Sequence, residues 1–219
     1  MLGETTNRIY LSIGYGRIRH KCSKDNPKAV ERETKSGDKT YAIEHTFVSG
    51  TLESVYYKEH HEYGNSWNIL LSDGETKYCL QISEKSRDAV EFLKRLPNLS
   101  INQFYRFTPY DFKDGEKRRR GLSIKDKADQ SINSYYQSFE QDGEKTVVKN
   151  LHNFPEPESP PKDSDDWKVY FIKVGKFLRE KSLEHLKQIV NEPTKEPEQP
   201  DDIPMGDEPP ADNSEDLPF

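Results

Sequence analysis

The sequence predicts a mainly β protein built around a five-stranded OB-fold barrel. Runs rich in β-branched and aromatic residues recur between turn signals, Asp-Gly turns join neighbouring runs, and a single helical pattern separates the third barrel run from the fourth. The chain has 219 residues, of which 32% are hydrophobic. This length and composition favour one domain of ordinary size with polar extensions.

The barrel strands follow the order β, β, β, α, β, β. Residues 41–48 and 52–57 predict one long strand that bends at Gly50, because glycine permits the bulge with which a sheet curls. Strands at 66–72 and 77–83 flank the Asp73-Gly74 turn, and two more are expected at 104–113 and 119–125. A long bent first strand and a helix between the third and fourth strands fit an OB-fold.

The barrel helix begins after a serine cap, Ser83 or Ser86, and Pro97 ends it. Its apolar residues recur at helical spacing: Ala89, Val90, Phe92, Leu93 and Leu96. Around the barrel, residues 9–19 predict an additional N-terminal strand or two, residues 20–39 a polar loop, and residues 131–149 a further hairpin. Residues 1–150 are therefore expected to form the OB-fold domain.

Three segments follow the predicted domain. Residues 151–163 form a Pro-rich linker, and residues 164–191 predict one long amphipathic helix. The apolar stripe of this helix, from Trp167 to Val190, is covered either by the barrel or by a second copy of the chain, which would make a homodimer. Residues 192–219 have ten acidic residues, one Lys and seven prolines, a composition that predicts a disordered acidic tail.

Charge is distributed unevenly along the chain. The formal net charge is -6, yet residues 1–150 carry 25 Lys and Arg against 22 Asp and Glu. A mildly basic body joined to an acidic arm indicates a nucleic-acid-binding protein. We expect no membrane-spanning segment, because no stretch of apolar residues approaches the length and hydrophobicity that a membrane span needs.

The residues do not indicate catalytic or metal chemistry. Cys22 and Cys79 form no CxxC pair, which excludes a four-cysteine zinc site and favours a reduced, cytoplasmic setting. His20 with Cys22, and His60 with His61, are too few ligands for a zinc site. Common phosphate-binding, nucleophile and zinc-protease motifs are absent from the sequence. We therefore expect neither an enzyme nor a cofactor.

Aromatic and cationic residues lie next to one another in the predicted strands. Single-stranded nucleic acid is bound by stacking bases on aromatic rings while a positive groove holds the phosphates. The candidate DNA-binding residues are Tyr56, Tyr57, Lys58, Trp67, Lys77, Tyr105, Arg106, Phe107, Tyr110, Phe112, Lys117, Arg118, Arg119 and Arg120. The alternative for each ring is a place in the barrel core, where strand aromatics are common.

Alternation along the strands separates some of these candidates. Trp67 shares a face with Ile69 and Leu71, which favours a core position for its indole. On the fourth strand, one face carries Phe104, Arg106, Thr108, Tyr110 and Phe112. Because that face includes a cation, it is the candidate ligand-facing side of the strand.

The densest positive cluster, residues 117–120, follows the turn between the fourth and fifth strands. That loop is one of the two that hold an oligonucleotide in an OB-fold, and Arg both pairs with phosphate and stacks on bases. The alternative is a solvated charge run. Arg17, Arg19 and Lys21 form a weaker second patch.

The C-terminal sequence Glu215-Asp216-Leu217-Pro218-Phe219 resembles the acidic tails of single-stranded DNA-binding proteins of bacteria and their phages. Bacterial members end in a run of Asp followed by Ile-Pro-Phe, and Asp201-Asp202-Ile203-Pro204 echoes that pattern internally. The helix at 164–191 and the longer barrel region look more like a phage-encoded member, which would act in the cytoplasm of a bacterial host.

The resemblance implies a function. Such a protein coats exposed single strands during replication, recombination and repair, and its tail, residues 215–219, recruits partners such as polymerase or helicase. It also implies that the anionic tail competes with DNA for the basic groove. The alternative from the residues is a protein-interaction adaptor, whose barrel and tail each hold a protein and which binds no nucleic acid.

Overall fold

We describe the fold from a computed structural model of the chain, which describes residues 8–33, 37–61, 64–142, 145–150, 152–156 and 164–189. The elements, in chain order, are β1 (Arg8–Gly14), β2 (Arg17–Lys21), β3 (Val30–Glu33), β4 (Lys39–His45), β5 (Val48–Lys58), β6 (Ser66–Ser72), β7 (Lys77–Ser83), α1 (Arg87–Arg95), a 3-10 turn (Leu96–Asn98), β8 (Phe104–Asp114), β9 (Lys117–Asp126), β10 (Gln137–Asp142), β11 (Lys145–Asn150) and α2 (Ser164–Ile189).

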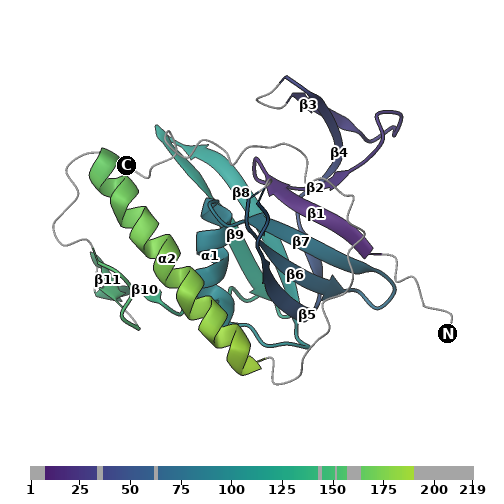
Figure 1. Ribbon diagram of the computed structural model, residues 1–219. Coiled ribbons are helices and arrows are strands. Elements are labelled where there is room, and N and C mark those ends of the chain that lie inside the picture. The colour runs from purple at the N-terminus through teal and green to yellow at the C-terminus, as the bar shows by residue number, and fades with distance from the viewer. Residues whose placement is uncertain are drawn as a thin grey trace.

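Nine strands form one curled sheet, like a half-barrel, in the order β3-β4-β2-β1-β7-β6-β5-β8-β9. Strands β10 and β11 pair separately as the hairpin that residues 131–149 predict. Figure 1 shows α1 between α2 and the sheet, while the β3–β4 hairpin projects away from the two helices. The protein is therefore mainly β, as its sequence predicts.

The predicted order of strands and helix is confirmed. Strands β5, β6 and β7 precede α1, and β8 and β9 follow it. In the sheet these five strands are neighbours in the order β7-β6-β5-β8-β9. Ser86 caps α1, since its side chain accepts a hydrogen bond of 3.1 Å from the backbone N–H of Ala89.

The five strands do not close into a barrel by themselves. Closure would require the two outer strands, β7 and β9, to pair. Instead β7 pairs in parallel with β1, and β8 is the one strand of the described residues that pairs with β9, which otherwise makes an isolated bridge from Lys125 to Ser131. The N-terminal strand β1 satisfies the hydrogen-bonding edge of β7, and the sheet continues through β2, β4 and β3.

Two local predictions are wrong. Residues 41–57 do not form one long strand bent at Gly50: β4 ends at His45, β5 begins at Val48, and Gly50 lies inside β5. The reason is that β4 pairs with β2 and β3, whereas β5 pairs with β6 and β8. Residues 20–39 are not all loop either, because they contain the end of β2 and all of β3.

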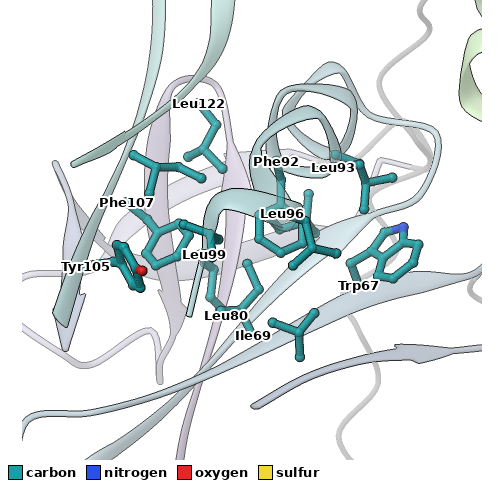
Figure 2. Packing of buried hydrophobic residues seen from close by; sticks show 14 of the residues in the cluster. Trp67, Ile69, Leu80, Phe92, Leu93, Leu96, Leu99, Tyr105, Phe107 and Leu122 are labelled. Atoms are coloured by element: carbon teal, nitrogen blue, oxygen red, sulfur yellow. The ribbon is translucent and has the colours of Figure 1, made fainter. Parts of the chain in front are cut away.

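The core lies between the sheet and α1. Figure 2 shows Trp67 and Ile69 of β6 and Leu80 of β7 together with Phe92, Leu93 and Leu96 from α1 and the turn that follows it. Phe92 packs against Phe107 of β8, with 6.4 Å between their ring centroids. Alternation therefore placed the inward faces of β6 and β7 correctly.

The body of the protein covers the apolar stripe of α2. Val174 and Leu178 are buried in the common core, and an ion pair of 3.1 Å joins Arg179 to Glu84 after β7. Phe154, in the segment predicted as a linker, is also buried and contacts Phe177 edge to face. The sequence left two partners for this stripe, the barrel or a second copy of the chain, and in the structure the stripe packs against the protein's own core.

The predicted acidic tail, residues 192–219, lies outside the described residues. Neither α1 nor α2 combines the length and the apolar character that a membrane-crossing helix needs.

Candidate nucleic-acid interface

The sheet has a second face, opposite the core, that is lined mainly by polar side chains. Strand residues alternate between faces, and Leu11, Val55, Ile69 and Leu80 point into the core. Their neighbours on β1, β5, β6 and β7 therefore share the other face. We call this set the polar face: Arg8, Tyr10, Ser12, Ser54, Tyr56, Lys58, Ser66, Asn68, Leu70, Ser72, Lys77, Cys79, Gln81 and Ser83.

The strand register places these residues in rows across four strands. One row runs from Ser12 on β1 through Gln81 and Asn68 to Tyr56 on β5. The next row contains Tyr10 and Cys79. The parallel pairing of β1 with β7 thus extends the face by one strand beyond those predicted for the barrel.

A hydrogen-bond network fixes the centre of the polar face. The buried amide of Asn68 accepts a hydrogen bond of 3.1 Å from Gln81 Nε2 and donates one of 3.2 Å to Ser66 Oγ. Cys79 Sγ lies 3.7 Å from Asn68 Oδ1 and 3.8 Å from the hydroxyl of Tyr56. The ring of Tyr56 is thereby held in place above the sheet, which suits a preorganised binding surface.

Burial moves the pKa values of Tyr56 and Cys79 further above neutral pH, where both groups are uncharged in any case. Desolvation, followed by the neighbouring Cys79, raises the pKa of the Tyr56 hydroxyl above its ordinary value. Desolvation likewise raises the pKa of the Cys79 thiol. A neutral phenol at neutral pH presents a ring that does not repel phosphate.

Three cations border this centre: Arg8, Lys58 and Lys77. Arg8 makes no ion pair within the described residues, although its positive charge acts on both Tyr56 and Cys79. Lys77 pairs with Glu53 at 3.0 Å, and both side chains are partly exposed. Tyr10 and Tyr56 are partly exposed among these cations. In proteins that bind single strands, aromatic rings stack on bases and neighbouring cations hold the phosphates.

Three of the predicted DNA-binding aromatics are core residues. Trp67 and Phe107 have 0% of their surface exposed and Tyr105 has 5%, so none has a free ring face for a base. Their positions follow from alternation, because Tyr105 and Phe107 lie opposite Gly50 and Val48 on the inward face of β5. Tyr57 is only partly buried, but its ring packs against Trp67 on the core side of the sheet, with 4.9 Å between centroids.

On β8, the face predicted to be the solvent-facing side is indeed the more exposed one. Arg106, Tyr110 and Phe112 lie on the more exposed side of the strand, and Phe112 is 52% exposed. The guanidinium of Arg106 lies 5.1 Å from the ring centroid of Phe47 and pairs with Asp129 at 3.0 Å. β8 continues the sheet beyond β5, so Arg106 extends the surface that begins at the polar face. The ring of Tyr110 lies over Gly121 and close to Glu91 of α1 instead.

The arginines of the predicted cluster, residues 117–120, are paired with carboxylates. Arg118 binds both carboxylate oxygens of Asp111 at 2.8 Å, and Arg119 contacts Asp114 at 2.6 Å. Arg120 is buried and pairs with Asp88 of α1 at 3.3 Å. Arg120 is therefore a structural residue, and phosphate would have to compete with carboxylates for Arg118 and Arg119. Lys117 lies at the start of β9.

The residues predicted for the site do not include four that lie on the polar face: Arg8, Tyr10, Asn68 and Gln81. The sequence does indicate where Arg8 and Tyr10 point, because residues 8–13 alternate in polarity. Ile9, Leu11 and Ile13 lie on one face of the strand, which places Arg8 and Tyr10 on the other. The pairing of β1 with β7 is a contact between distant parts of the chain, which local patterns do not encode. The tail residues 215–219 lie outside the described residues.

Comparison of the chain with protein-family models, curated proteins and solved structures found no match. Within the ranges that the structure describes, His, Cys, Asp and Glu side chains form no group of three or more that could hold a metal ion.

Proposed function

We propose that this protein binds single-stranded DNA without sequence specificity and recruits partner proteins through its acidic C-terminal tail. The observation that carries the proposal is the polar face. It holds Tyr10 and Tyr56 beside Arg8 and Lys58 on neighbouring parts of one sheet. Base stacking and phosphate neutralisation need these two kinds of side chain side by side.

The strand arrangement supports an OB-type assignment. In an OB-fold, the face of the second and third strands binds the ligand. The second and third of the five predicted strands are β6 and β7, and both contribute to the polar face. The added strand β1 would widen that face.

The tail supplies the recruiting half of the proposal. Glu215-Asp216-Leu217-Pro218-Phe219 joins two carboxylates to a terminal aromatic residue. Such a peptide suits a pocket that holds one aromatic ring and is lined by Arg or Lys. Through the family resemblance, the partners would be replication or recombination proteins such as a polymerase or helicase.

The first test compares a labelled oligo(dT) with a duplex of the same length in fluorescence anisotropy, at a low and a high NaCl concentration. We expect a preference for the single strand and an affinity that falls with salt. An equal affinity for duplex, or an affinity that salt does not change, would contradict the proposal.

A pair of charge variants locates the site. Arg8→Gln should weaken oligo(dT) binding and make the slope of log K against log salt shallower by about 0.7, because one phosphate contact is lost. Lys187→Gln removes an exposed cation from α2, away from the polar face, and should change neither quantity. Equal effects of the two variants would move the DNA site away from the polar face.

One observation favours a second candidate function. The arginines of the densest cationic segment are paired with Asp88, Asp111 and Asp114 rather than left for phosphate. A protein-interaction adaptor would need no free cations there. The adaptor hypothesis predicts that the protein binds neither oligo(dT) nor duplex in the same titrations.

A further inference from the structure

Tyr15 is an exposed aromatic residue in an unfavourable backbone conformation. It occupies the two-residue turn between β1 and β2, with φ of 52°, and Gly16 follows with φ of 69°. Positive φ at both central residues is the geometry of a type I′ turn, for which Asn-Gly is strongly preferred. Tyrosine at the first position carries a steric cost that asparagine avoids.

The ring of Tyr15 is nevertheless held in a defined place. A Cβ added to Gly16 would lie 2.6 Å from the backbone N of Asp111, so the turn packs closely against β8. The guanidinium of Arg32 lies 4.5 Å from the centroid of the Tyr15 ring. The side chain is still 54% exposed. A strained, fixed and exposed aromatic residue is the kind of outlier that points to function.

The surroundings of Tyr15 are cationic. Arg32 pairs with Glu44 at 2.8 Å, and Arg19 lies 3.8 Å from the same carboxylate, so two arginines share one acid. Arg17 is exposed on the same face of β2 as Arg19 and makes no ion pair among the described residues. The local excess of positive charge suits an anionic ligand.

This cationic group is continuous with the polar face. Arg19 pairs in register with Ser12, which begins the row that crosses Gln81 and Asn68 to reach Tyr56. Four strand spacings of about 4.8 Å separate β2 from β5, or roughly 19 Å along the sheet. A single strand that crosses the polar face perpendicular to the strands would therefore meet arginines and an aromatic ring at its far end.

We infer that Tyr15 is a further base-stacking residue, which binds one base of a single-stranded nucleic acid while Arg17 and Arg32 contact the adjoining phosphates. Arg19 is buried and adds only its charge to this group. This inference rests on the proposed function and adds to it a direction, from β5 across β6, β7 and β1 to the β1–β2 turn.

The turn geometry supplies a variant that separates stability from binding. Tyr15→Asn places the preferred residue in the type I′ turn and removes the ring, so the full-length variant should unfold at the same or a higher temperature than the wild type. Tyr15→Gly is a second replacement that the turn accommodates, and Tyr15→Phe keeps the ring.

The binding experiment uses labelled oligo(dT) and an oligonucleotide of equal length whose residues lack bases. Tyr15→Asn and Tyr15→Gly should bind oligo(dT) at least about fivefold more weakly than the wild type, whereas Tyr15→Phe should bind it equally. All three should match the wild type on the abasic strand, because stacking requires a base.

Two results would overturn the inference while leaving the proposed function intact. One is wild-type affinity of Tyr15→Asn for oligo(dT). The other is an equal loss on oligo(dT) and the abasic strand, which would mean that Tyr15 only positions Arg32. If the wild-type protein binds no single strand, both proposals fail together.

Discussion

Arg118, Arg119 and Arg120 are adjacent in the chain, yet their side chains have different surroundings. Arg118 and Arg119 are exposed and pair with carboxylates of the β8–β9 hairpin, whereas Arg120 reaches Asp88 inside the protein. Exposed pairs contribute little to stability, but removing one partner of a buried pair leaves a charge without compensation. The sequence shows one basic run, and burial separates Arg120, which pairs inside the protein, from the two exposed arginines.

Arg120→Met should destabilise the protein by about 3–5 kcal/mol at neutral pH, because Asp88 would remain buried without this cation. Chemical denaturation with urea measures the change. The double variant Asp88→Leu with Arg120→Met should be clearly more stable than Arg120→Met alone. If it is not, the ion pair does not explain the loss.

The same pair predicts a pH dependence. Burial raises the pKa of Asp88 even though Arg120 opposes the shift. A carboxyl group with a raised pKa holds its proton more tightly in the folded state, so its contribution to stability is greatest at low pH. That contribution is lost as the pH rises from about 3.9, the unfolded value, through the raised folded value.

Without Arg120 the pKa of Asp88 should rise further. As the pH rises from about 5 to about 8, the unfolding free energy of Arg120→Met should therefore fall by more than that of the wild type. Urea titrations of both proteins at the two pH values test this expectation. Parallel pH dependences would contradict it.

At the scale of elements, α2 is part of the folded body. Leu178 has 0% of its surface exposed and lies in the common core, whereas Ile172 on the same helix is 71% exposed. Leu178→Ala should lower the unfolding free energy by about 2–5 kcal/mol. Ile172→Ala should change it by no more than about 0.5 kcal/mol.

Urea denaturation followed by both far-UV circular dichroism and tryptophan fluorescence checks this pair of variants. Trp67 reports on the sheet and Trp167 on α2, so coincident transitions are expected if the helix and sheet unfold together. Equal stabilities of the two variants, or separate transitions in the wild type, would show that α2 is not packed on the body in solution.

The elements also show how far local patterns reach. The Asp73-Gly74 hairpin, a helix with a serine cap at Ser83 or Ser86, and the inward faces of β6 and β7 were all predicted, and the structure shows the cap at Ser86. Turns, caps and alternation depend on residues close in sequence. The division between β4 and β5 was not predicted, because it depends on which distant strands each one joins.

At the scale of the whole molecule, charge links the body to the tail. Deleting residues 192–219 removes ten acidic residues and one Lys. If the tail competes with DNA for the cationic surface, the shortened protein should bind oligo(dT) more tightly, and high salt should reduce the difference. Anisotropy at two salt concentrations measures it, and an unchanged or weaker affinity would rule out the competition.

A single substitution in the tail separates its two proposed effects. Phe219→Ala keeps every side-chain charge, so oligo(dT) affinity should remain at the wild-type value. Capture of a partner protein by the immobilised chain should be lost, because the aromatic anchor is missing. Retained capture would show that the terminal Phe does not anchor the partner.

The sequence by itself determined the β-rich class, the order of strands and helix, the hairpin turns and the acidic composition of the tail. These features follow from local propensity, alternation and charge, which are properties of neighbouring residues. It also predicted a site of tyrosines beside cations, and of the predicted residues Tyr56 and Lys58 lie on the polar face.

Only the tertiary structure decided which aromatics face outward and what they lie beside. The parallel pairing of β1 with β7 brings Arg8 and Tyr10 next to Tyr56, from positions more than forty residues apart in the chain. The same packing buries Trp67, Tyr105 and Phe107. Contacts between distant segments depend on how apolar surface is buried by the whole chain, and no local pattern specifies that burial.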